Sequence, residues 1–161
     1  MVGERGASTR EMKNFSHLNA RGEIKMVDVS AKPPVSREAV ARGAILLQST
    51  TIAAIEKDAV AKGNVFACAR VAGILAAKKT GELIPLCHPL SISHCSVEFE
   101  IPSTRDRVVI TATARITAAT GVEMEALTAV SVAALTIYDM CKALDKTMRI
   151  TDVFLVSKTK K

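Results

Sequence analysis

The fold is decided by the stretch Thr120-Gly-Val-Glu-Met-Glu-Ala-Leu-Thr128, which continues as Ala129-Val-Ser-Val-Ala-Ala-Leu-Thr-Ile-Tyr-Asp-Met-Cys-Lys-Ala143. Apolar residues recur in it at spacings of three and four, which predicts a helix that runs to about Leu144. Thr120 and Glu123 have the spacing of a capping box that would open this helix. The residues expected to face the core are Leu127, Val130, Ala134, Ile137, Cys141 and Leu144.

The opposite stripe of this helix is polar at both ends and apolar in the middle. It comprises Glu125, Thr128, Val132, Leu135, Asp139 and Lys142. A monomer would leave the apolar middle in water, which favours a subunit contact over a few harmlessly exposed side chains. Glu125 and Asp139 are 14 residues apart, about 21 Å along a helix. One site that uses both residues would therefore need two chains.

Asp139 and Lys142 are the only charged residues between Ala126 and Ala143. At a spacing of three they can pair on the helix surface, and such a pair is commonly a solvated one that contributes little. Their position in a nearly uncharged stretch favours a second interpretation, in which the carboxylate and the ammonium exchange protons with a substrate.

Alternating apolar residues predict the strands of a sheet. Cys95–Ile101 and Val108–Ile116 form a predicted hairpin with one buried face. Ile24–Ser30 and Ile150–Val156 are further predicted strands, and Arg37–Leu47 fits a helix or a strand, with its alternation favouring a strand. The expected order is β-β-α-α-β-β-α-β. A ferredoxin-like α+β fold, with a four-stranded, mostly antiparallel sheet and helices packed on one face, is the simplest arrangement.

Two helices are expected before the hairpin. Thr50 or Thr51 would cap a short helix through Lys57, and Asn64 would cap a helix from Val65 to Lys79 that Gly81 ends. The segment Lys62-Gly-Asn64 places a lysine beside the second helix N-terminus, where backbone N–H groups favour a phosphate. A turn with a solvated lysine is the alternative.

The length and charge of the chain limit the classes of function. Its 161 residues fit a single catalytic domain, residues 16–158, between a flexible arm, residues 1–15, and a tail, residues 159–161. The net charge of +6 favours anionic partners, but scattered basic residues and 3% aromatic residues fit a small polyphosphate better than nucleic acid. No apolar run approaches the length of a membrane span, about 18 residues, so we expect a cytoplasmic protein with no membrane contact.

The segment Leu86-Cys-His-Pro89 places an imidazole in the apolar run from Leu83 to Ile92. A lone histidine in such a run is commonly a satisfied core residue. His94 and Cys95 follow nearby, but the spacing is not that of a zinc site, so no metal site is predicted.

Taken together, these segments resemble the cyclic pyranopterin monophosphate synthases, also called molybdenum cofactor biosynthesis protein C. The resemblance is nearly continuous from about Ser16 to Lys158 and is carried by Met26–Lys32, Lys62–Ala67, Leu83–Leu90, Thr120–Thr128 and Ile137–Ala143. It implies a ferredoxin-like fold, a homohexamer built as a trimer of dimers, and active sites at the dimer interface. It also implies a phosphorus–oxygen lyase that converts a cyclic dihydro-GTP to cyclic pyranopterin monophosphate and diphosphate.

The resemblance implies a role for individual positions. Asp139, Lys142 and Lys62 match the catalytic acid–base residues of the family. The matching substrate-binding positions are Leu86, Cys87, His88, Glu123, Met124, Glu125, Arg37 and Lys158. The family commonly ends in a glycine-containing Lys-Ser-Gly-Gly-Lys-type tail, whereas this chain ends Ser157-Lys-Thr-Lys-Lys161, which puts the tail contacts in doubt.

Other functions remain open at this point. A basic nucleotide-binding or nucleic-acid-binding module without catalysis would bind in a salt-dependent manner and form no product. A silent scaffold for another protein of the pathway would associate without turnover. No cofactor is implied, although Mg²⁺ could accompany the triphosphate of the substrate.

Overall fold

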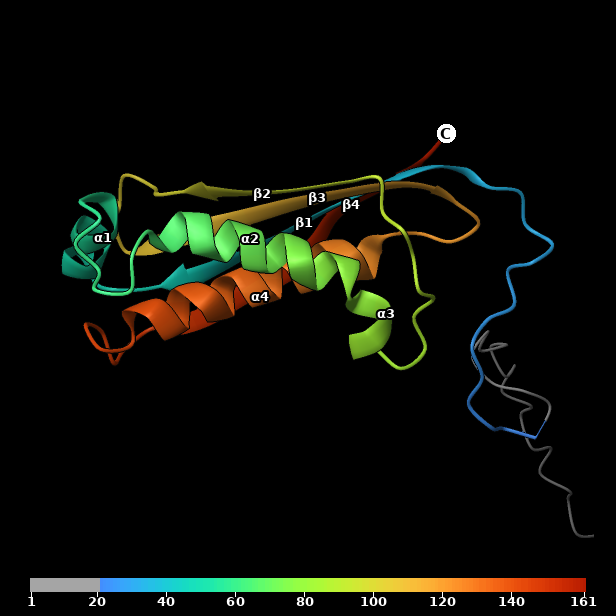
Figure 1. Ribbon diagram of the computed structural model, residues 1–161, viewed down its shortest axis with the longest axis horizontal. Helices are drawn as coiled ribbons and strands as arrows, with labels where there is room; N and C mark the ends of the chain where they lie inside the picture. The colour runs from blue at the N-terminus through green and yellow to red at the C-terminus, as the bar shows by residue number, and fades with distance from the viewer. Residues whose placement is uncertain (1–20) are drawn as a thin grey trace, which may run out of the picture.

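The structure, a computed structural model, describes residues 21–161 and contains one four-stranded antiparallel sheet in the order β2-β3-β1-β4. The helices α2 and α4 lie side by side across one face of the sheet, while α1 and α3 lie toward opposite ends (Figure 1). This arrangement confirms the predicted ferredoxin-like α+β fold. The elements are β1 (Val35–Leu46), α1 (Ser49–Glu56), α2 (Val65–Lys78), α3 (Thr80–Leu83), β2 (His94–Glu100), β3 (Arg107–Ala118), α4 (Glu123–Cys141) and β4 (Arg149–Lys160).

The predicted hairpin is present, with β2 paired to β3 in the register Cys95↔Ala114. The ambiguous segment is a strand, β1, which pairs with β3 on one side and β4 on the other. Its pairing with β4 shifts register on both sides of Arg42. At Gly43 a Cβ atom would lie 2.7 Å from a Val130 side-chain carbon, so only glycine lets α4 approach β1 this closely.

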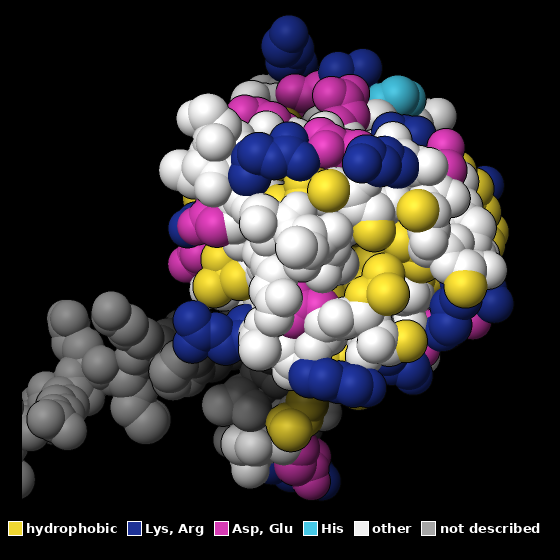
Figure 2. Space-filling model, turned by 90° about the vertical axis from the view of Figure 1, so that its left-hand side faces the viewer, with side chains coloured by type: hydrophobic (Ala, Val, Ile, Leu, Met, Phe, Trp, Pro, Cys, Tyr) yellow, Lys and Arg dark blue, Asp and Glu magenta, His cyan; other side chains and the backbone are white. Residues whose placement is uncertain are grey.

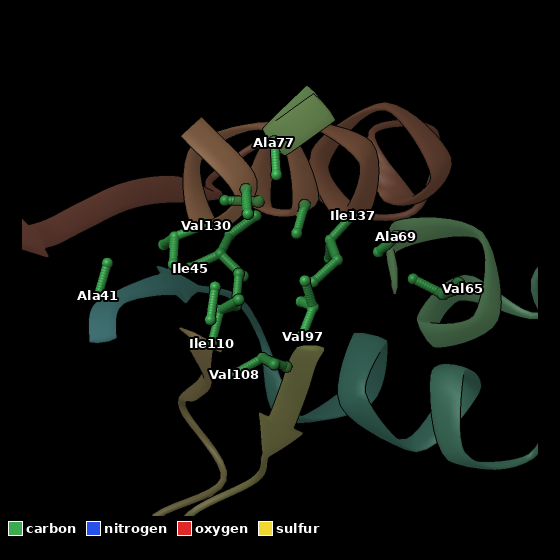
Figure 3. Close-up of a cluster of buried hydrophobic side chains, with 14 of the residues drawn as sticks. Ala41, Ile45, Val65, Ala69, Ala77, Val97, Val108, Ile110, Val130 and Ile137 are labelled. Atoms are coloured by element: carbon green, nitrogen blue, oxygen red, sulfur yellow. The ribbon is translucent and has the colours of Figure 1, made fainter. Parts of the chain in front are cut away.

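The core lies between the sheet and the two long helices and is built from small aliphatic side chains. Ile45, Ile110 and Val97 on the strands point toward Val130 and Ile137 on α4 (Figure 3). Gly73 on α2 packs against the backbone of α4, since a Cβ atom there would lie 2.9 Å from the Ala129 carbonyl oxygen. Small residues thus bring the two helices close together over one face of the sheet.

The predicted strand Ile24–Ser30 is wrong. Only Ile24 forms a single β-bridge, and the rest of that segment is irregular. Ile24 and Met26 are 74% and 48% exposed, while Val27 and Val29 are half-buried, so the apolar residues of this segment do not form one buried face of a strand. The predicted arm and the first residues of the predicted domain lie outside the described residues.

Two predicted helix caps are also wrong. Val122, not Thr120, is the N-cap residue of α4, and no side chain caps the helix because valine has no hydrogen-bond acceptor; the Glu123 carboxylate pairs with Lys158. Similarly, α1 begins after Gln48, and Thr51 is buried within it. The predicted Asn64 cap of α2 is confirmed, since the Asn64 side chain accepts a hydrogen bond from the Ala67 N–H at 2.8 Å.

The ends of several elements also differ from the prediction. Gly81 lies within α3 rather than ending α2, and β4 continues to Lys160. Helix α4 ends at Cys141, so Leu144 is 54% exposed instead of belonging to the core. Among residues 21–161, α4 is also the one helix whose length and composition would allow it to cross a membrane, and half of its apolar window is buried inside this fold.

Candidate functional site

A cavity of about 370 Å³, called here the first cavity, lies where α4 begins. Its walls are the extended chain around residues 27–32, the loop between α3 and β2, and the first turn of α4. Six residues predicted to bind substrate line it together: Leu86, Cys87, His88, Glu123, Met124 and Glu125. The structure therefore gathers these predicted residues at one place within a single chain.

The first cavity is held in shape by contacts between segments distant in sequence. The His88 ring nitrogen Nε2 lies 2.9 Å from the Val27 carbonyl oxygen, which fixes the extended segment to the α3–β2 loop. Gly81 allows α3 to lie against this loop, because a Cβ atom at Gly81 would be 2.9 Å from the Pro89 Cα. His88 thus has a partner in the chain while it also lines the cavity.

The two glutamates at the start of α4 have different electrostatic surroundings. Burial, reinforced by the nearby Glu123 carboxylate, raises the pKa of Glu125, a residue that is only 3% exposed. Burial also acts to raise the pKa of Glu123, but its own backbone N–H and Lys158 outweigh burial and the net pKa is lowered. Burial, with a smaller effect from Glu125, raises the pKa of the Cys87 thiol. The first cavity therefore contains two neighbouring carboxyl groups whose pKa values are shifted in opposite directions.

A second cavity of about 290 Å³ adjoins the first and contains the other two predicted substrate-binding residues, Arg37 and Lys158. The Arg37 guanidinium donates hydrogen bonds to the carbonyl oxygens of Ala118 and Ala119, at 2.9 and 3.0 Å. Lys158 Nζ lies 3.0 Å from Glu123 Oε1. Both cations therefore hold the β3–α4 connection and the start of α4 from the neighbouring strands.

The three residues predicted to be catalytic meet at the other end of α4. Lys62 Nζ donates to Asp139 Oδ2 at 2.7 Å and to the Asp139 carbonyl oxygen at 2.9 Å. Lys142 Nζ lies 2.7 Å from Asp139 Oδ1. The Lys142 and Lys62 hydrogen bonds lower the pKa of Asp139 to about 2, and Asp139 in turn raises the pKa of Lys142.

This cluster of Lys62, Asp139 and Lys142, called here the lysine cluster, is exposed, with each side chain about half accessible to water. In the single chain the pKa of Lys142 is raised, because the hydrogen bond and the charge of the Asp139 carboxylate favour the charged ammonium.

The lysine cluster and the first cavity lie at opposite ends of the molecule. Helix α4 runs without a break from Glu123 to Cys141, so it holds the two ends apart (Figure 1). From Glu125 to Asp139 the helix rises by about 21 Å. The lysine cluster of one chain therefore does not reach the first cavity of the same chain.

Figure 2 shows the α1 end of the molecule, where basic side chains are dispersed among acidic ones instead of forming one continuous patch. This distribution agrees with the scattered basic residues of the sequence. Within residues 21–161, no group of three or more His, Cys, Asp or Glu side chains is arranged to hold a metal ion.

The structure adds lining residues that the site prediction omitted. Val27, Val29 and Lys32 line the first cavity, and Gly121 lines both cavities. The first three belong to the Met26–Lys32 segment that carries the family resemblance, which was the available signal for them. Gly121 is part of the predicted capping box. The interpretation of Thr120 as a cap gave no reason to expect Gly121 in the walls of the cavities.

Comparison with known proteins identifies the family of the chain. The chain is 57% identical to a cyclic pyranopterin monophosphate synthase of Chloroflexus aggregans over 89% of this chain and 87% of the relative. It is 53% identical to the protein of that name from Desulfatibacillum aliphaticivorans, over 91% of this chain and 92% of the relative. The synthase of Heliobacterium modesticaldum is 52% identical over 92% and 93% of the two chains. The profile of the MoaC family matches residues 26–161, and the chain belongs to this family of enzymes.

Proposed function

We propose that this protein is a cyclic pyranopterin monophosphate synthase of molybdenum cofactor biosynthesis. Its substrate would be (8S)-3',8-cyclo-7,8-dihydroguanosine 5'-triphosphate, and its products cyclic pyranopterin monophosphate and diphosphate. The observation that carries the proposal is the 57% identity over 89% of the chain to a relative with this name. The reaction would take place in the cytoplasm.

The active site is proposed to form between two chains. The first cavity of one chain would face the lysine cluster of its partner, because α4 keeps the two ends of one chain about 21 Å apart. The middle of α4 supports a subunit contact, since Leu135 remains 57% exposed there. We propose a homohexamer, a trimer of such dimers, as the complete assembly.

Each part of this composite site has a chemical role. The first cavity would hold the bicyclic part of the substrate, with Glu125 and His88 among its polar groups and Leu86, Cys87 and Met124 among its packing surfaces. The second cavity, with Arg37, Glu123 and Lys158, would lie beside the phosphates. Lys62, Asp139 and Lys142 of the other chain would donate and remove protons as the nitrogen rings open and reclose.

The overall reaction requires no change in oxidation state. A hydroxyl group of the sugar-derived part gives its proton to a neutral lysine of the lysine cluster, and its oxygen bonds to the α-phosphorus as the bond from that phosphorus to the diphosphate breaks. The diphosphate leaves with the electron pair of that bond, and lysine ammonium groups neutralise the developing charge. If Mg²⁺ accompanies the triphosphate, phosphate oxygens and water would supply most of its ligands.

Enclosure by a partner chain would also change the lysine cluster. Contact with an apolar surface removes water, which lowers the pKa of a lysine and brings it closer to the range of a proton donor or acceptor. Asp139 would remain ionised between the two ammonium groups, because its pKa is about 2. The Asp139 carboxylate would thus orient both lysines and favour their charged forms.

The direct experiment is incubation of the purified protein with enzymatically prepared cyclic dihydro-GTP, followed by mass spectrometry of the pterin product and of diphosphate. Lys142→Ala and Asp139→Asn proteins of verified fold are run in parallel. Product from the parent protein and large losses in both variants are expected. Tight binding of substrate without product would contradict the proposal and favour a binding module.

A further inference from the structure

The first and second cavities meet at Glu123. Gly121 and Glu123 line both of them, so they form the wall between the two spaces. One carboxylate oxygen of Glu123, Oε1, lies 3.0 Å from Lys158 Nζ in the second cavity. The other, Oε2, lies over Gly121, where an added Cβ atom would be only 1.9 Å away. The absence of a side chain at Gly121 is what lets the carboxylate rest on this wall.

The charges of the second cavity suit an anion better if Glu123 moves away from Lys158. Its cations are Arg37, Lys158 and Lys160, and its carboxylates are Glu38 and Glu123. Glu38 is paired with Arg115, which neutralises it from outside the cavity. The Arg37 side chain is anchored on two backbone carbonyls. Lys158 and Lys160 are thus the cations that an entering anion would meet, and the Glu123 carboxylate already pairs with Lys158.

The Glu123–Lys158 pair is suited to exchange. The Lys158 side chain is 67% exposed and the Glu123 side chain 28% exposed, so water screens their attraction. Ion pairs of this kind contribute little to stability and cost little to break. A diphosphate group carries more charge than one carboxylate and offers several acceptor oxygens, so it competes well for the ammonium.

We propose that Glu123 is a gate between the two cavities that a diphosphate group displaces. The diphosphate takes Lys158, and the freed Glu123 carboxylate turns into the first cavity beside Glu125. There it accepts hydrogen bonds from the N–H groups of a guanine-like ring. Occupancy of the second cavity thereby strengthens ring binding in the first. This inference rests on the proposed function for its choice of ligands, and the diphosphate can be the substrate's own arm or the free product.

The first test measures binding of inorganic diphosphate by calorimetry. The Lys158→Ala variant should bind about 10-fold more weakly, since it removes the receiving ammonium. The Glu123→Gln variant should bind diphosphate about 3- to 10-fold more tightly, because it removes the competing negative charge. Lys57→Ala, an exposed lysine remote from the second cavity, is the matched control and should bind as the parent does. Unchanged or weaker binding by Glu123→Gln would overturn the gate.

The second test measures coupling between the cavities. Guanosine, which carries no phosphate, is titrated into the protein with and without saturating diphosphate. The parent protein should bind guanosine about 5-fold or more tightly with diphosphate present, and Glu123→Gln should lose this difference. Equal guanosine affinities with and without diphosphate in the parent would contradict the proposal.

The source of the diphosphate follows from competition. If diphosphate and GTP exclude one another, the substrate arm is the occupant, whereas joint binding identifies free diphosphate as the occupant. The gate and the proposed function can fail separately. Synthase activity with unaltered diphosphate binding in Glu123→Gln removes the gate alone, and the reverse pattern removes the synthase function alone.

Discussion

The two ends of α4 present opposite kinds of chemistry. At its first turn Glu125 is 3% exposed in a cavity, and burial raises its pKa. Beyond its last turn Lys142 lies in water and, with Lys62, surrounds an Asp139 carboxylate whose pKa is about 2. The first end has a cavity but none of the three residues proposed to be catalytic. The other end has these three residues but lies open to water. The contrast supports the proposal that one site combines the two ends from two different chains.

The largest expected effect comes from the exposed end. Lys142→Ala should lower turnover by about 10²- to 10⁴-fold, the usual contribution of a general acid or base. Guanosine binding should change less than turnover, because the side chains that line the first cavity belong to the other chain and are unaltered. Steady-state rates and guanosine titrations measure the two effects. Lys146→Ala, a nearby exposed lysine, is the control. An equally large loss of guanosine affinity in Lys142→Ala would contradict the separation of catalysis and ring binding between the two ends of α4.

The next effect comes from the enclosed end. Glu125→Gln should weaken guanosine binding by about 10- to 100-fold, because a hydrogen bond to a charged or buried carboxyl contributes about 1.5–3 kcal/mol. Calorimetric titration measures it, with the exposed Glu98→Gln on β2 as control. Guanosine affinity equal to that of the parent protein would remove Glu125 from the ring site.

A third prediction separates stability from ring binding. Asp145 is 1% exposed, and its carboxylate accepts hydrogen bonds from the Gln48 N–H at 2.7 Å and the Thr147 N–H at 2.8 Å. It thereby joins the turn after α4 to the start of α1. Asp145→Asn should lower the free energy of unfolding by about 2–4 kcal/mol at pH 7, because the Gln48 N–H loses its acceptor. Guanosine binding by the folded variant should match the parent.

The pH dependence of this loss has a defined sign. Burial acts to raise the pKa of Asp145, but the hydrogen bonds from Gln48 and Thr147 outweigh it, and the net pKa is below 3.8. The Asp145 carboxylate therefore makes its full contribution to the free energy of unfolding above pH 3.8. This contribution is lost as the pH falls through the folded-state pKa. Denaturation midpoints of parent and variant should converge in strong acid. A difference that is constant with pH would contradict the role of the charge.

The smallest effect tests how Lys62 is held. Asn64 caps α2 two residues after Lys62, and Asn64→Ala should cost about 1 kcal/mol of stability. Turnover should fall modestly, since Lys62 loses a fixed support, while guanosine binding stays unchanged. Thermal melts and steady-state rates measure both. A larger effect on guanosine binding than on turnover would contradict the role of the Asn64 cap in holding Lys62.

The sequence predicted the fold where periodicity and burial coincide. The same aliphatic core buries the alternating residues of β2 and β3. It also buries one face of β1 and the apolar stripe of α4. Prediction failed where a residue contacts a partner distant in sequence instead of the local partner that the pattern suggested. Glu123 could not be recognised as a partner of Lys158, because 35 residues separate them and the pair forms only when β4 lies beside β1. The exposed alternation of Ile24–Ser30 similarly lacks a neighbouring strand.

The sequence predicted which residues gather at the two ends of α4 and that these ends lie apart, but it did not predict the second cavity. Lys62, Asp139 and Lys142 were named from the resemblance, and the structure brings them into contact. Spacing along α4 already indicated that Glu125 and Asp139 cannot meet in one chain. The second cavity, by contrast, depends on the folding of β4 over the start of β1. No local pattern indicates it.

The central claim is that one active site combines the first cavity of one chain with the lysine cluster of another. The most direct test mixes two impaired variants, Glu125→Gln and Lys142→Ala, at a substrate concentration too low to saturate Glu125→Gln, dissociates the assembly and allows subunits to exchange. Random exchange of equal amounts should restore about a quarter of the parent activity, because one site in four then receives two intact halves. Mass spectrometry verifies the exchange. Mixed assemblies that stay as impaired as the separate variants would contradict the claim.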